Sequence, residues 1–130
     1  MPARLFTLDE AVRLLPVVRR LVTEIQAAKT AVVEASAMLE TLLERTGGNG
    51  HLAGQIEEAR AAVETSIADM QALMGELEEM GVELKDVEQG LVDFRNMREG
   101  RVVYLCWRQG EETIAFWHEL DTGFAGRQPL

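Results

Sequence analysis

Two apolar stripes with helical spacing flank one glycine-rich segment, and this feature constrains the fold more than any other. The first stripe recurs at alternating steps of four and three residues from Leu14 to Leu42, and the second from Leu52 to Met80. Such spacing is typical of a helix face that packs on another helix. Residues 46–51 between them contain three glycines and an asparagine, which disfavour a helix. The pattern predicts a long antiparallel two-helix coiled-coil hairpin with its turn at residues 46–51.

The side-chain sizes along the two stripes are complementary. If the helices fold back about Asn49, Leu39 lies opposite Ala59 and Ala35 opposite Val63. Each small residue then meets a larger one, so the two surfaces interdigitate without voids. Four further apolar residues lie just off the stripes and need a second cover, either from the C-terminal region or from another subunit: Leu15, Val22, Ile67 and Met74.

The first helix begins with a capping box. Thr7 and Glu10 have the spacing at which side chain and backbone amide bond reciprocally, so the helix is expected to start at Leu8. Pro16 lacks an amide hydrogen and clashes with the preceding turn. We therefore expect a short N-terminal helix before the long hairpin.

After Gly81 the pattern changes from helical to alternating. Residues 82–86 and 91–94 are short extended candidates, whereas 101–108 and 113–118 are rich in β-branched and aromatic residues and predict stronger strands. The expectation is a small three-stranded antiparallel sheet. A loop over residues 109–112 joins the two stronger strands as a hairpin.

That short loop fixes which side chains share a face. It predicts Leu105 on the same face as His118, and Tyr104 and Cys106 on the other face with Trp117. Both faces are then largely apolar, so one is expected to pack on the helices and the other on something else.

The fold class is therefore α+β in a single domain, residues 1–130, with the helical hairpin at 7–80 and the sheet and tail at 81–130. The net charge of -9 makes nucleic acid and anionic membranes poor partners, because both are bound through clustered Lys and Arg. No segment has the run of about 18 apolar residues that crosses a bilayer. The single cysteine, Cys106, fits a reducing, cytoplasmic location and is most simply a small buried apolar residue.

The C-terminal tail carries the candidate site. His118, Glu119 and Asp121 offer an imidazole and two carboxylates, the ligand types that hold a divalent metal. The alternative is that His118 is a hydrogen-bonded residue at a strand end. Arg108 and Arg127 are candidates to grip an anionic ligand through their guanidinium groups, and structural ion pairs are the alternative.

Three classes of function remain open. The first is a non-enzymatic interaction or oligomerisation module, which binds a second copy of the chain or another protein. The reason is that the long helical arms carry apolar residues that the hairpin itself does not cover. The second is a small-ligand or divalent-metal site between the sheet and the tail. An enzyme comes last, because the sequence contains no GxSxG, GxxxxGK[ST], GxGxxG or CxxC motif.

Several longer stretches near both ends are distinctive. They are residues 6–11 with Leu14-Leu15-Pro16, 81–86, 90–94, 103–108, 117–119 and 123–129. Together they resemble the prokaryotic family known as domain of unknown function 2203. The resemblance implies a small bacterial cytoplasmic protein and no particular activity. It draws attention to the polar and aromatic residues within those stretches: Lys85, Asp86, Asp93, Arg108, Trp117, His118, Glu119, Arg127 and Gln128.

Overall fold

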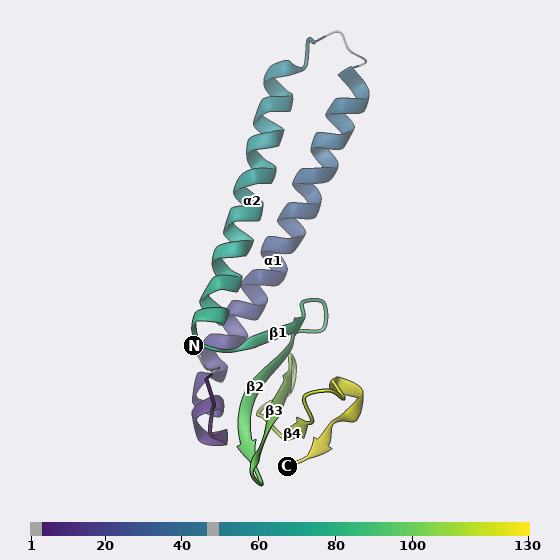
Figure 1. The fold of residues 1–130 in the computed structure, drawn as a ribbon. Coiled ribbons are helices and arrows are strands. Elements are labelled where there is room, and N and C mark those ends of the chain that lie inside the picture. The colour runs from purple at the N-terminus through teal and green to yellow at the C-terminus, as the bar shows by residue number, and fades with distance from the viewer. Residues whose placement is uncertain (1–3, 47–49) are drawn as a thin grey trace. The chain divides into compact units, whose positions relative to one another are not determined.

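The structure, a computed structural model, describes residues 4–46 and 50–130 (Figure 1). Two long helices precede an antiparallel sheet, which confirms the α+β class. The elements are α1 (Leu8–Thr46), α2 (Ala53–Glu79), β1 (Glu83–Asp86), β2 (Leu91–Arg98), β3 (Arg101–Arg108), β4 (Phe116–His118), a 3-10 helix (Phe124–Gly126) and β5 (Gln128–Pro129).

The chain divides into two compact units. A helical unit comprises Glu24–Leu73, and a sheet unit comprises the residues up to Thr23 together with Met74–Leu130. The sheet unit thus contains the first turns of α1 and the last turns of α2, whereas the sequence suggests a boundary at residue 81.

The start of α1 shows the predicted capping box. The Thr7 amide donates to Glu10 Oε1 at 2.8 Å, and the Glu10 amide donates to Thr7 Oγ1 at 3.1 Å. The expected break at Pro16 is wrong, because α1 runs unbroken through that residue. Pro16 costs the helix one backbone hydrogen bond, and the burial of Leu15 and Val18 on either side offsets that loss.

Burial in the helical unit follows the two predicted stripes. Every stripe position there is buried or half-buried: Ile25, Ala28, Val32, Ala35, Leu39, Leu42, Leu52, Ile56, Ala59, Val63, Ser66, Met70 and Leu73. At the end of α1 and the start of α2, Leu39 and Ile56 pack against a buried cluster of Leu42, Leu52 and Ala59. Leu39 and Ala59, predicted to face each other, thus belong to one cluster. The predicted turn about Asn49 lies outside the described residues.

The sheet has five antiparallel strands in the order β1-β2-β3-β4-β5, not three. One reason is that both short extended candidates form strands, as β1 and β2. β2 continues to Arg98 and joins β3 through a tight turn at Glu99 and Gly100, whose φ angles are 50° and 82°. The other is that the tail returns, so that Trp117 pairs with Gln128 and β5 forms the far edge. Neither feature has a strong β-propensity signal.

The inner face of the sheet packs on the start of the chain and of α1. Phe6 meets Phe94 edge to face at a ring distance of 5.4 Å, and the Phe6 amide donates to the Arg95 carbonyl at 2.7 Å. Arg19 lies over the Trp107 ring, 5.8 Å from its centre. This inner core also contains Val92, Val103 and Leu105, and it covers the off-stripe residues Leu15 and Val22, all buried.

The predicted facing of the last two strands is wrong. Tyr104 pairs with His118 and Leu105 with Trp117, so His118 shares a face with Tyr104 and Cys106. The reason is loop length: β4 begins only at Phe116, after a longer connection than the expected four residues. A shift of one residue in the pairing of β3 with β4 moves His118 to the outer face of the sheet, which does not pack on α1.

Candidate metal and ligand site

Three neighbouring strands bring Asp93, Cys106 and His118 together on the outer face of the sheet. Asp93 on β2 pairs directly with Cys106 on β3. His118 on β4 pairs with Tyr104, two residues from Cys106 on the same face of β3. Directly opposite and diagonal neighbours of this kind are close enough for their side chains to touch. All three are buried: Asp93 is 3% exposed, Cys106 1% and His118 2%.

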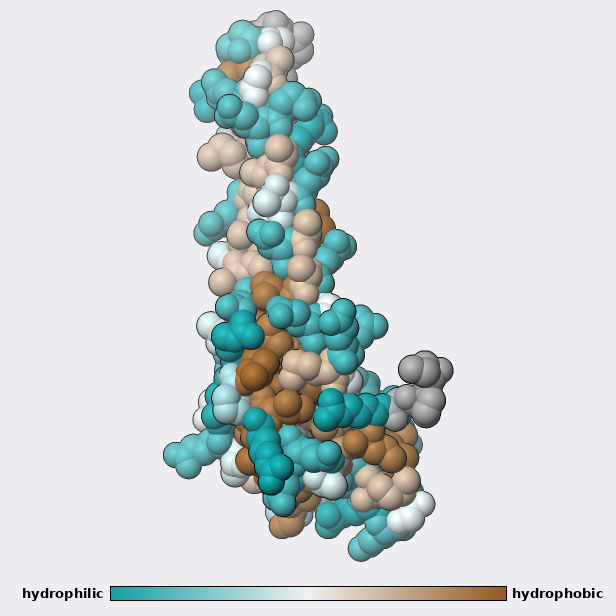
Figure 2. Space-filling model, turned by 90° about the vertical axis from the view of Figure 1, so that its left-hand side faces the viewer, coloured by the Kyte–Doolittle hydropathy of each residue, from teal (hydrophilic) through white to brown (hydrophobic). Residues whose placement is uncertain are grey.

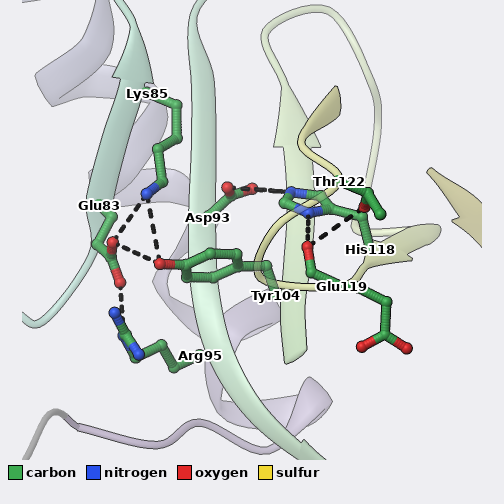
Figure 3. A network of polar contacts seen from close by, with 8 residues as sticks. All are labelled: Glu83, Lys85, Asp93, Arg95, Tyr104, His118, Glu119 and Thr122. Carbon is green, nitrogen blue, oxygen red and sulfur yellow. Dashed lines mark hydrogen bonds and ion pairs between the residues drawn. The ribbon is translucent and has the colours of Figure 1, made fainter. Parts of the chain in front are cut away.

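Both ring nitrogens of His118 have partners (Figure 3). Nδ1 is 2.7 Å from the Glu119 carbonyl oxygen, which only accepts, so Nδ1 carries the hydrogen and donates. Nε2 faces the Asp93 carboxyl and is 3.1 and 3.0 Å from its two oxygens. One proton therefore lies between Nε2 and Asp93, and the carbonyl fixes the orientation of the ring.

Burial sets the proton affinities of the other two groups. It raises the pKa of Asp93 above the ordinary value, and the charge and hydrogen bond of His118 offset part of that rise. Burial also raises the pKa of the Cys106 thiol to about 12, with a further contribution from the Asp93 charge. A thiol nucleophile needs a lowered pKa and a base that takes its proton, so this arrangement opposes thiol catalysis.

The same three side chains match the ligand set of a transition metal. One ligand atom from each of Asp93, Cys106 and His118 lies within 4.8 Å of the other two, and the searched residues 4–46 and 50–130 contain no other such group of three. Zinc bond lengths near 2.0–2.3 Å place tetrahedral ligand atoms about 3.3–3.6 Å apart. Small side-chain movements would therefore suffice to close the cluster around an ion.

A small cavity opens onto this cluster. Its volume is about 150 Å³, and its walls include all three residues of the cluster. The rest of its lining is part polar and part apolar: Lys85, Leu91, Tyr104, Leu120, Gly123 and Phe124. The apolar residues Leu120 and Phe124 come from the tail, which folds back over the outer face of the sheet.

A charged network borders the cavity on the side of β1 (Figure 3). Glu83 accepts from Lys85 Nζ at 3.0 Å, from the Tyr104 hydroxyl at 2.8 Å and from Arg95 Nε at 2.8 Å. Burial by itself would raise the pKa of Glu83, but the hydrogen bonds from Lys85, Tyr104 and Arg95 together lower it. One carboxylate thus lies between two cations.

Of the three predicted metal ligands, the structure places only His118 in this cluster. Glu119 turns its carboxylate away from the ring, and Arg101 Nε donates to its two oxygens at 3.0 and 3.2 Å. Asp121 is exposed, and the carboxylate that meets His118 is instead Asp93. Glu119 contributes through its backbone carbonyl.

The two predicted anion-binding arginines have other contacts. Arg127 Nη2 donates to both carboxylate oxygens of Glu111 at 2.8 Å, and its guanidinium stacks over Phe116 at 4.1 Å. This is the structural ion pair that was the alternative, with Glu111 as the partner. Arg108 is exposed, and its guanidinium lies 5.8 Å from the Phe124 ring centre.

Sequence reasoning missed Cys106 as a site residue, named Lys85 only through the family resemblance and did not connect Asp93 with His118. The register of β2, β3 and β4 was the missing information. Asp93 was a visible signal, because an acidic residue between Val92 and Phe94 in an apolar strand needs a buried partner.

Comparison with protein families gives a match over residues 4–130, to the family described as an uncharacterized conserved protein, DUF2203. The chain belongs to this family. A search of curated proteins and a search of solved structures each found no match. Family membership therefore brings no activity with it. Within the described residues, no helix combines the length and the apolar character needed to cross a membrane.

Proposed function

We propose that this DUF2203 protein binds a divalent transition metal ion, zinc first of all, through Asp93, Cys106 and His118. The observation that carries the proposal is the convergence of a carboxylate, a thiol and an imidazole, buried and within 4.8 Å of one another. Thiolate and imidazole ligands favour zinc and similar ions over magnesium and calcium, which prefer oxygen.

The orientation of His118 supports this assignment. Metal-binding histidines characteristically donate their second ring N–H to a carbonyl or carboxylate, which aims the free lone pair at the ion. The Glu119 carbonyl accepts that bond, and Thr122 Oγ1 donates to the same oxygen at 3.3 Å. Nε2 then points towards Asp93 and the place of the ion.

Charge balance makes metal binding compatible with burial. Without metal, the cluster holds the Cys106 thiol proton and one proton between Asp93 and His118. A divalent ion would replace both, so the total charge of the buried group stays the same. Binding is therefore expected to release about two protons at neutral pH. A reducing compartment such as the cytoplasm would keep the thiol available.

The test is metal content and zinc affinity of protein purified without an affinity tag. We expect one zinc per chain, and we expect Cys106→Ser and His118→Gln to weaken binding by about 100-fold or more. His51→Gln is the matched control, since it changes the second histidine of the chain, outside the cluster. Glu119→Gln and Asp121→Asn are expected to leave affinity unchanged. Zinc binding that survives Cys106→Ser and His118→Gln would contradict the proposal.

A second candidate function is self-association of the helical unit, as a coiled-coil homo-oligomer. Its buried core is small, and Val33 and Met38 are 59% and 58% exposed. A step of five residues turns a helix by about 140°, so Val33 and Met38 lie on different sides of α1 and do not share one stripe. Figure 2 likewise shows hydrophilic and pale side chains interspersed on the visible face of the helices.

Light scattering at micromolar concentration tests this second candidate. Because the two residues lie on different sides of α1, a dimer that buries either one is expected to dissociate when both are changed to Lys, since charge at a buried interface is costly. A monomer at all concentrations would exclude self-association, and a search for another protein partner would follow.

A further inference from the structure

The cavity beside the cluster suggests what the metal would bind. We infer, on the basis of the proposed metal site, that the ion has an open fourth position and that a small monocarboxylate from the cavity occupies it. Three protein ligands and one exchangeable position are the arrangement of zinc sites that take up ligands, whereas structural zinc sites have four protein ligands. Within the described residues the cluster supplies three.

The cavity is in the right place for such a ligand. Asp93, Cys106 and His118 all form part of its wall, so a molecule inside it would reach the metal directly. Its volume of about 150 Å³ matches that of a cavity which holds one benzene-sized molecule. This size suits a carboxylate with a short carbon chain.

Charge around the cavity favours an anion. Asp93 and the Cys106 thiolate would neutralise a divalent ion, which leaves the site itself uncharged. Lys85 lines the cavity, and its only carboxylate partner in the network, Glu83, is shared with Arg95. One positive charge is thus left over beside the ion, and a monoanion complements it.

The remaining walls suit a short hydrocarbon tail. Leu91, Leu120 and Phe124 contribute apolar side chains to the lining of the cavity. A carboxylate would bind the metal with its oxygen, approach Lys85 with its charge and place its carbon chain against these side chains. Inorganic anions share only the first two contacts.

The experiment uses the full chain loaded with Co²⁺, whose visible absorption reports both the Cys106 thiolate and the coordination number. Titration with acetate, propionate and butyrate is expected to change the spectrum in a saturable way. Apparent affinity should rise about 3- to 4-fold for each added methylene, as expected for burial of apolar surface. Octanoate is expected to bind no better than butyrate, since it exceeds the cavity.

Lys85→Met is expected to weaken butyrate binding by about tenfold, because it removes a charge close to the ion. Lys29→Met is the matched control: it changes the only other lysine of the chain, in the helical unit, and should leave affinity unchanged. Co²⁺ binding with a thiolate band but no response to carboxylates would overturn this inference and leave the metal site standing. Equal binding of chloride and butyrate would also overturn it. Absence of a thiolate–cobalt band would overturn the proposed metal site itself.

Discussion

The helical unit and the sheet unit are stabilised by different kinds of contact. In the helical unit, burial repeats every three or four residues, and each residue's partners follow from the helical period and the position of the turn. In the sheet unit, the important contacts join residues far apart in sequence, such as Asp93 with His118 and Phe6 with Phe94. The comparison shows that a regular periodicity specifies the helical scaffold, whereas the register of the strands brings the residues of the candidate site together.

The largest expected change in the free energy of unfolding distinguishes the two histidines of the chain. His118→Ala leaves the Asp93 carboxyl buried without its partner, and we expect a loss of about 3–5 kcal/mol in the free energy of unfolding. His51→Ala, at an exposed position of the helical unit, is expected to change it by less than about 0.5 kcal/mol. Urea denaturation of metal-free protein measures both. A loss below about 1 kcal/mol for His118→Ala would contradict the account of Asp93 as a paired buried group.

Core leucines provide the next comparison. Leu105→Ala in the inner sheet core is expected to cost about 3–4 kcal/mol, and Leu42→Ala about 2 kcal/mol, because the small cluster around Leu42 relaxes more easily. Trp107 and Trp117 are the only tryptophans, so fluorescence reports the sheet unit, while far-UV circular dichroism reports mainly the helices. If Leu42→Ala shifts the fluorescence transition as much as Leu105→Ala does, the units are not energetically distinct.

One substitution is expected to have opposite signs in the two units. A Cβ at Gly90, where φ is +65°, would lie 2.6 Å from Gln109 Cβ, so Gly90→Ala should cost about 1–3 kcal/mol. Gly54 lies near the start of α2 with nothing within 4 Å of an added Cβ. Gly54→Ala is therefore expected to stabilise by about 0.5 kcal/mol. Thermal unfolding of both variants tests this, and destabilisation by Gly54→Ala would contradict it.

The smallest of the expected losses of stability depends on pH. Because the pKa of Glu83 is lowered in the folded state, its contribution is present above the ordinary value of 4.5 and is lost as pH falls through the folded pKa. Glu83→Gln is expected to cost about 1 kcal/mol at pH 7, and the difference from the wild type should shrink below pH 4.5. Glu64→Gln, on the exposed surface of the helical unit, is the control. Urea denaturation at several pH values measures both, and a Glu83→Gln cost that does not change with pH would contradict the charged network.

The site was less predictable than the scaffold for a specific reason. The sequence singled out His118, but it grouped that residue with Glu119 and Asp121, which lie within three positions of it in the chain. In a strand, adjacent side chains point to opposite faces, and the true partners come from neighbouring strands. A connection longer than the predicted four residues before Phe116 changes the facing, so no local pattern places His118 beside Cys106.

The sequence by itself determined the two helices, their buried stripes, the capping box at Thr7 and the change to strands after Gly81. These features depend on residues within a few positions of one another, where helical period and capping geometry apply directly. Only the tertiary structure decided that α1 continues through Pro16, that the tail supplies a fifth strand, and that Asp93, Cys106 and His118 meet beside a cavity. Each of those outcomes rests on contacts between distant segments, whose burial outweighs local preference.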